Sequence, residues 1–192
     1  MNGWRHRMAV AAFALAGLVA ATASAEPMAD EAVELINAVR ARMPGCGDDG
    51  GSMQRVSLPG TPARPVLSWN PQLAAAAETH ARAMVEQHFF AHTDPQGRDV
   101  AYRVTATGYP WRSVGENLAA GQRTLEEAVR GWLLSESHCR NLLDERYVEF
   151  GLAKVVSPNL KDRYRTYWAL VLGRPAAGIS TAALDNPALV RR

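Results

Sequence analysis

The chain has 192 residues, of which 47% are hydrophobic and 21% charged, with 15 glycines and 11 prolines. This balance is typical of one ordinary globular domain, and it excludes a collagen, a coiled coil and a wholly disordered chain. Its 21 basic residues nearly match its 19 acidic ones, so charge gives no reason to expect nucleic acid or an anionic membrane as the main partner.

The first 25 residues have the pattern of a secretory signal peptide. Arg5 and Arg7 precede an apolar run that begins at Met8, and Ala23-Ser24-Ala25 supplies a small-x-small exit. The run is about 14 residues long, whereas a membrane span needs about 20. We therefore expect residues 1–25 to be removed on export, which leaves a soluble protein without a transmembrane anchor, in the periplasm or outside the cell.

Cys46 and Cys139 are the only cysteines of the chain, and both follow the leader. An exported chain with two cysteines most simply forms one disulfide. A bridge across this separation would stabilise the fold by roughly 4 kcal/mol in the chain-entropy model. The alternative is a thiol nucleophile at Cys139 activated by the neighbouring His138, and export argues against it.

Four segments have the signals of helices. The first has apolar residues at helical spacing, the second begins with an Asn-Pro pair suited to an N-cap and a first helical position, and the fourth begins with a Thr-x-x-Glu capping box. The third follows a capping aspartate. We expect helices over residues 30–42, 70–88 and 99–107, and a further one that begins at residue 124.

Two apolar segments near the C-terminus, residues 150–156 and 165–172, are typical of strands, and the polar residues between them predict an antiparallel hairpin. Residues 46–65 are rich in glycine and proline and predict a loop. Helices precede strands, so the fold class is α+β, with a small sheet covered by helices. We place the domain at residues 26–175 and expect a poorly ordered tail at 176–192.

Four histidines follow the leader, and two of them have local explanations. His80 lies in the apolar stripe of the second expected helix, where a hydrogen-bonded core histidine is the expected role. His88 and His92 are four residues apart, a metal-binding spacing on a continuous helix. Phe89-Phe90 and the turn at Pro95 indicate that the helix ends there, so this pair is a weak metal signal.

The remaining signal lies in three ordered motifs: residues 90–98 around His92, Gly115-Glu116-Asn117, and residues 135–143 around His138, which follow Trp132. At these motifs the sequence resembles the CAP superfamily of cysteine-rich secretory, antigen 5 and pathogenesis-related 1 proteins, and most closely its bacterial secreted SCP-domain members. The resemblance covers about residues 31–175. It implies an α-β-α sandwich with a central antiparallel sheet and a cleft lined by two histidines and acidic residues.

The resemblance assigns the cleft residues by motif. His92 and His138 match the two cleft histidines, and Glu116 matches the cleft acid. Family members often carry a second cleft glutamate three residues after the helical tryptophan, where this chain has Ser135, so Glu136 is only a candidate for that place. Two further cleft residues are expected to orient their neighbours: Asn117 and Arg140.

Two chemical interpretations of the cleft remain open. Two imidazoles and a carboxylate, with water in the fourth place, would make an open zinc site able to activate water, and divalent metal binding is known at this cleft in the family. Without metal, the same groups would form a hydrogen-bonded polar cluster. Trp111, in an expected loop, is the tryptophan we expect to be exposed and to meet a ligand.

Three functions follow from these interpretations. The first is a secreted or periplasmic CAP-domain module that binds a lipid, a cell-envelope component or a protein. The alternative is a metal-dependent, peptidase-like hydrolase with His92 and His138 as ligands and Glu116 as general base and candidate catalytic residue. The third is a structural role in the cell envelope.

Overall fold

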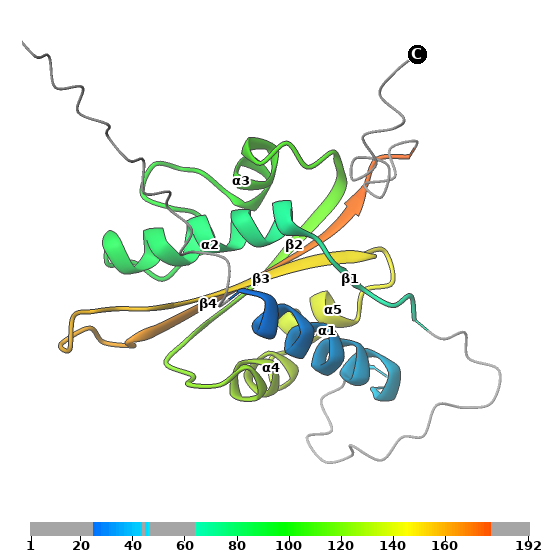
Figure 1. The fold of residues 1–192 in the computed structure, drawn as a ribbon, viewed down its shortest axis with the longest axis horizontal. Coiled ribbons are helices and arrows are strands. Elements are labelled where there is room, and N and C mark those ends of the chain that lie inside the picture. Colours follow the sequence, from blue (N-terminus) through cyan, green and yellow to red (C-terminus); the bar gives the residue numbers. More distant parts are fainter. Residues whose placement is uncertain (1–24, 44, 47–63, 178–192) are drawn as a thin grey trace, which may run out of the picture.

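The computed structural model describes residues 25–43, 45–46 and 64–177 (Figure 1). The expectations for the signal peptide, the loop at 46–65 and the tail at 176–192 fall wholly or mostly outside these residues. The elements in chain order are α1 (Ala25–Arg42), β1 (Ser68–Trp69), α2 (Pro71–Glu86), α3 (Val100–Ala106), β2 (Trp111–Ala120), α4 (Leu125–Leu133), α5 (Glu136–Leu143), β3 (Glu149–Val156) and β4 (Thr166–Pro175).

The predicted caps begin the predicted helices. The Asn70 side chain accepts hydrogen bonds from the backbone N–H groups of Gln72 and Leu73, and thereby starts α2. The Asp99 carboxylate accepts from the backbone of Tyr102 and starts α3. The Thr124 hydroxyl caps α4 in the same way. The helix α5, which directly follows α4, is absent from the sequence-based prediction.

The helix α2 ends at Glu86, close to the predicted end. His88 follows with a left-handed φ of 57°, and the backbone N–H of Phe89 bonds to the carbonyl of Met84 at 3.2 Å. This is the geometry of a Schellman C-cap, in which glycine is the usual left-handed residue. His88 and His92 therefore do not share a helix face. This confirms the sequence-based expectation that the helix ends between them.

The four strands form one sheet in the order β1-β3-β4-β2. β3 and β4 form the predicted antiparallel hairpin, and β4 also pairs antiparallel with β2. The two-residue β1 lies parallel to β3, so the sheet as a whole is mixed. The strand β2 was not predicted from the sequence, although this ten-residue edge strand carries Glu116.

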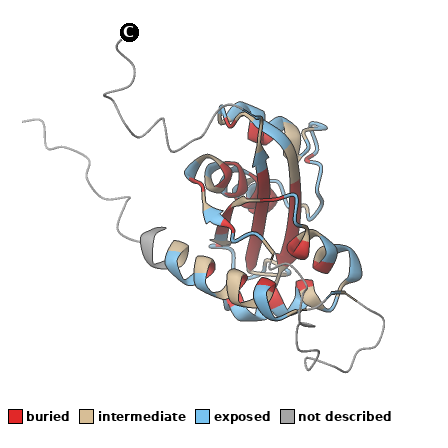
Figure 2. Ribbon diagram, turned by 90° about the vertical axis from the view of Figure 1, so that its right-hand side faces the viewer, coloured by how far each residue is buried: buried red, intermediate tan, exposed pale blue. Residues whose placement is uncertain are grey.

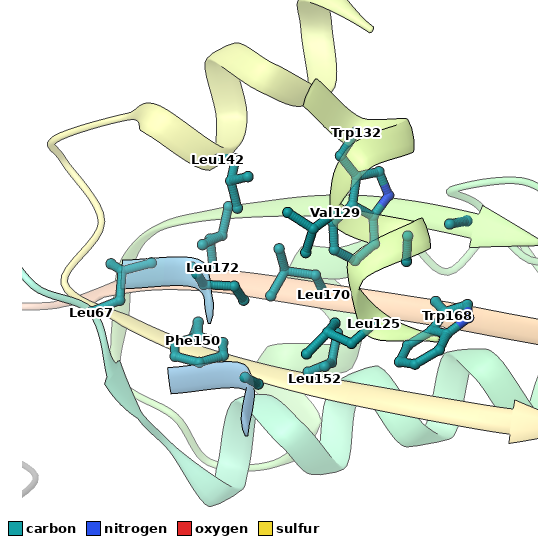
Figure 3. Close-up of a cluster of buried hydrophobic side chains, with 14 of the residues drawn as sticks. Leu67, Leu125, Val129, Trp132, Leu142, Phe150, Leu152, Trp168, Leu170 and Leu172 are labelled. Atoms are coloured by element: carbon teal, nitrogen blue, oxygen red, sulfur yellow. The ribbon is translucent and has the colours of Figure 1, made fainter. Parts of the chain in front are cut away.

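Helices cover both faces of the sheet, which makes an α-β-α sandwich (Figure 1). Alternation along β4 separates the two cores: Trp168, Leu170 and Leu172 pack toward α1, α4 and α5, whereas Tyr167 and Val171 pack toward α2 and α3. Figure 2 shows the buried residues gathered along the strands and the inner sides of the helices. Figure 3 shows the first core, with Leu170 and Leu172 beside side chains of α4 and α5.

A disulfide and a set of hydrogen bonds from Arg40 hold α1 against α5. Cys46 and Cys139 form the predicted disulfide, with their Cα atoms 5.9 Å apart, so the thiol-nucleophile interpretation is wrong. The buried Arg40 of α1 donates to the carbonyls of Leu142 at 2.6 Å and Pro65 at 3.0 Å. These ties connect the end of α1, the segment before β1 and the end of α5.

The other layer depends on a close contact between α2 and the sheet. A Cβ atom on Gly151 of β3 would lie 1.9 Å from the backbone nitrogen of Ala74 and 2.3 Å from the carbonyl carbon of Leu73. Both neighbours are helix backbone, which cannot rotate away as a side chain can. Glycine at this position therefore lets α2 approach the sheet.

We predict that Gly151→Ala lowers the free energy of unfolding by about 2–3 kcal/mol, because α2 must shift away from β3. Gly131→Ala is the matched control: it lies inside α4, and its nearest non-local atom would be 3.9 Å away. That control should be neutral or up to about 1 kcal/mol more stable. Chemical denaturation of both variants measures the difference, and equal stabilities would contradict the close-contact argument.

Candidate functional site

The candidate site is built around Glu116, whose side chain is only 2% exposed. Successive side chains of β2 point to opposite faces of the sheet. Leu118 belongs to the core under α2, and Ala119 belongs to the core under α4 and α5. Glu116 shares the face of Leu118, so its carboxylate points toward α2 and α3.

Both oxygens of the Glu116 carboxylate are engaged. Arg103 of α3 donates through Nη2 to Oε2 at 2.6 Å, and this arginine is itself buried. His92 Nδ1 lies 2.8 Å from Oε1, and because a carboxylate only accepts, this nitrogen carries the proton. Arg103 also donates to the backbone carbonyl of His92 at 3.1 Å, which joins the three residues in one network.

His80 is the predicted core histidine. It is fully buried in α2, and its Nε2 donates to the carbonyl of Ala91 at 2.8 Å. The same nitrogen lies 3.9 Å from Glu116 Oε1. Burial lowers the pKa of His80 and so favours the neutral ring. The bond to Ala91 holds the segment that leads to His92 against α2.

The other face of β2 attaches α5. Asn117 Nδ2 donates to the carbonyl of His138 at 2.9 Å, so this residue orients a neighbour as predicted. Asn141 Nδ2 donates to the carbonyl of Glu116 at 3.0 Å and to Asn117 Oδ1 at 3.1 Å. Trp132 of α4 donates to the next outward carbonyl along β2, that of Leu118, at 2.9 Å. Side chains of α4 and α5 thus cover the edge of the sheet.

Gly115 explains the first position of the Gly-Glu-Asn motif. A Cβ atom there would lie 2.5 Å from the Tyr147 hydroxyl and 2.8 Å from Asn141 Oδ1. A larger residue would force these two side chains to shift, whereas glycine leaves them room to pack over β2. The glycine therefore positions the asparagine that holds α5 beside Glu116.

His138 and His92 meet at this edge strand from opposite layers. Their ring centroids are 6.4 Å apart, and the His92 side chain is 57% exposed. The hydrogen bond to Glu116 raises the pKa of His92. Burial, and then the charge of His92, lower the pKa of His138. The pair therefore favours a protonated His92 beside a neutral His138, on a surface that solvent reaches.

Glu136 and Arg140 lie outside this network. They form an ion pair with each other, one turn apart on the outer side of α5, with side chains 53% and 71% exposed. Neither has a hydrogen bond or ion pair to His92, Glu116 or His138 in the part of the chain that the structure describes. Trp111 is exposed, as expected, and its indole N–H donates to the Thr105 hydroxyl at 2.9 Å.

Arg103 is the site residue that sequence reasoning missed. A signal was present, because an arginine occupies a position of the short helix α3 that packs inward beside Val104. From the sequence, Arg140 was the arginine expected to orient its neighbours in the cleft. Only the pairing of β2 with the sheet reveals that Glu116 faces α3.

The donor atoms bear on the expected zinc site. In the described residues, no three histidine, cysteine, aspartate or glutamate side chains form a group that could hold a metal ion. Both oxygens of Glu116 accept hydrogen bonds, from Arg103 and from His92. The groups left to face one another as candidate metal ligands are the two imidazoles of His92 and His138. Zinc at this site stays a prediction.

Comparison with known proteins agrees with the fold and the motifs. The family described as "CAP: Cysteine-rich secretory protein family" matches residues 33–172. The chain belongs to this family. This membership confirms the resemblance that the three ordered motifs indicated.

Two relatives come from Bacillus subtilis (strain 168). The uncharacterized protein YkwD is 30% identical over 88 residues, which are 46% of this chain and 34% of the relative. The uncharacterized membrane protein YlbC is 30% identical over 86 residues, 45% of this chain and 25% of the relative. The matches thus span only about a quarter to a third of these relatives.

Solved structures share the fold at lower identity. An extracellular protein containing an SCP domain from Bacillus anthracis str. Ames has a TM-score of 0.59 and 23% identity, over 78% of this chain and 41% of that one. An outer surface protein from Borrelia burgdorferi has a TM-score of 0.56 and 17% identity, over 79% and 92%. Within the described residues, no helix is both long and apolar enough to cross a membrane.

We predict that Arg103→Met costs about 3–5 kcal/mol of unfolding free energy, because it leaves a buried carboxylate without its cation. The double substitution with Glu116→Gln should recover part of this loss, since the uncompensated charge is then removed. Arg82→Met is the control, because Arg82 pairs with Glu78 on the exposed side of α2. Strictly additive losses in the double variant would contradict the pairing.

We predict that His92 titrates above the ordinary imidazole pKa of 6.5, and His80 and His138 below it. The His92 contribution to stability is then complete below pH 6.5 and is lost as the pH rises through its raised pKa. The buried neutral histidines destabilise the fold as the pH falls below 6.5. NMR titration of chelator-treated protein tests this order, and Glu116→Gln should lower the pKa of His92.

Proposed function

We propose that the chain is an exported CAP-domain binding module that acts in the periplasm or outside the cell. The leader pattern of residues 1–25 and the disulfide both support export. The fold is shared with an extracellular SCP-domain protein and an outer surface protein. The ligand we propose is a lipid, a cell-envelope component or a protein.

The observation that carries this proposal is the engagement of Glu116. A general base must offer a free carboxylate oxygen to the water or substrate proton that it removes. Here one oxygen accepts from Arg103 and the other from His92, and the side chain is closed to solvent. This arrangement favours a role for Glu116 in holding the site together, and it favours binding over hydrolysis.

The ligand-facing groups in this proposal are the two histidines. His92 is more than half exposed, and His138 is half-buried beside it. Because Glu116 fixes the Nδ1 proton of His92, the opposite ring nitrogen faces a ligand: it donates a hydrogen bond in the protonated ring, and it can bind a metal ion once it has released its proton. In a metal-bound form His92 and His138 would be the ligands and Glu116 would orient the His92 ring, while a bound zinc ion would supply Lewis-acid attraction for an anionic or carbonyl group.

Zinc calorimetry on metal-stripped mature protein near neutral pH tests the histidine pair. We expect one-to-one binding at micromolar affinity or tighter that the His92→Ala/His138→Ala double variant abolishes. Glu136→Gln is the matched control, because that carboxylate pairs with Arg140 on the outer side of α5. It should leave the affinity unchanged.

Two outcomes would contradict parts of this proposal. Absence of zinc binding by the folded protein would reduce the cluster to a hydrogen-bonded scaffold, and ligand searches would then turn to lipids and proteins directly. Peptide hydrolysis by the zinc-loaded protein that Glu116→Gln abolishes would replace the binding function with the hydrolase alternative. We expect no such turnover, because the carboxylate is closed to solvent and both of its oxygens already accept hydrogen bonds.

A further inference from the structure

A pocket lies away from the histidine cluster, where the segment after α2 meets the turn between β3 and β4. Its volume is about 450 Å³, within the range of small-molecule sites. In Figure 1 the β3–β4 hairpin extends toward the same end of the molecule as the C-terminal end of α2. None of the residues that line the pocket is His92, Glu116 or His138.

One wall of the pocket is aromatic. The Phe90 ring lies 5.6 Å from Tyr164 and 6.5 Å from Tyr167, centroid to centroid, and the two tyrosines contact edge to face at 5.9 Å. Phe90 remains 43% exposed. The rings pack directly against one another, so no ammonium-sized gap separates them as in an aromatic cage. The wall instead offers an apolar surface to a ligand.

The turn that carries this wall is internally satisfied. The Asp162 carboxylate accepts hydrogen bonds from the backbone N–H groups of Tyr164 and Arg165, both at 2.9 Å, and from the Tyr167 hydroxyl at 3.0 Å. The one acidic side chain among the lining residues is therefore part of the turn. Its hydrogen bonds orient the turn and Tyr167.

The charge that the pocket presents is positive. Lys161 and Arg163 line it with exposed side chains, and neither forms an ion pair within residues 64–177. The Arg163 guanidinium lies 5.0 Å from the centre of the Tyr164 ring, so one cation adjoins the aromatic wall. Leu160, directly before Lys161, is 83% exposed and adds apolar surface to the turn.

Backbone conformation singles out the same place. In the described chain, two residues other than glycine have a left-handed φ: His88 at 57° and Arg165 at 64°. His88 lines the pocket, and Arg165 follows the lining residue Tyr164. The φ of His88 belongs to the C-cap of α2, and that of Arg165 belongs to the turn that Asp162 stabilises. Both segments that form the pocket thus hold a backbone that most residues avoid.

We propose that this pocket binds amphipathic anions, meaning an acyl or other apolar chain that ends in a phosphate or carboxylate. The apolar chain of the ligand packs against Phe90 and Tyr164, where burial of apolar surface drives binding. The head group accepts charge-assisted hydrogen bonds from Lys161 and Arg163. The proposal rests on the lipid-binding form of the proposed function and places it at a site that uses none of the histidine cluster.

Calorimetry of the mature protein with octyl phosphate tests the site, with octanol and octyltrimethylammonium as probes of the same chain length. The two ionic probes are kept below their critical micelle concentrations, and octanol below its solubility limit. We expect one-to-one binding of octyl phosphate, with roughly tenfold or greater preference over both other probes, because only the phosphate engages the two cations. Equal affinity for octanol, or no binding of octyl phosphate, would overturn the proposal.

Matched variants locate the site. Lys161→Gln/Arg163→Gln should weaken octyl phosphate binding roughly tenfold or more, and so should Phe90→Ser. The controls are Arg112→Gln/Arg130→Gln, which removes the same charge from exposed positions outside the pocket, and Leu134→Ser, which removes an exposed apolar side chain elsewhere. Similar losses in variants and controls would reduce the effect to general surface charge or hydrophobicity and overturn the proposal.

Two further arms identify the source of the anion and separate the two proposals. Sedimentation with vesicles of phosphatidylcholine and phosphatidylglycerol that depends on Lys161 and Arg163 would indicate a lipid head group, whereas octyl phosphate binding without vesicle binding would indicate a free amphiphile; each supports the site. His92→Ala/His138→Ala should leave octyl phosphate affinity unchanged. Loss of affinity in that variant would overturn the independence of the pocket.

Discussion

The constraint on which this structure depends is a buried negative charge on an edge strand. A carboxylate removed from water must recover its hydration energy from fixed donors, and Glu116 does so with Arg103 and His92. Those two donors come from α3 and from the segment after α2. One side chain therefore decides where two separate segments must lie.

The backbone carbonyls along the free edge of β2 also need hydrogen-bond donors. An edge strand presents unpaired carbonyls, and Asn141 and Trp132 satisfy those of Glu116 and Leu118. The same bonds seat α5, and the disulfide at Cys139 ties that helix to the end of α1. His138 thereby reaches His92 from the other layer. His92 and His138 lie close together because residues of both helical layers form hydrogen bonds to the same edge strand, β2.

Local sequence signals predicted most of the elements, because helix caps and hairpin alternation act over a few residues. Asn70 and Thr124 begin helices where expected, and His80 is the predicted core histidine. The strand β2 escaped prediction because buried polar residues, Glu116 and Asn117, interrupt the alternation that marks a strand. Its burial depends on partners far away in the chain.

The sequence by itself determined the helices other than α5, the hairpin, the α+β class, the disulfide and the motifs that identify the family. The tertiary structure alone decided that Arg103 neutralises Glu116, that Glu136 and Arg140 pair outside the cluster, and that the aromatic pocket forms between two turns. The reason is physical: caps and periodicity act between near neighbours, whereas the partner of a buried charge is chosen by which surfaces the packed layers bring together.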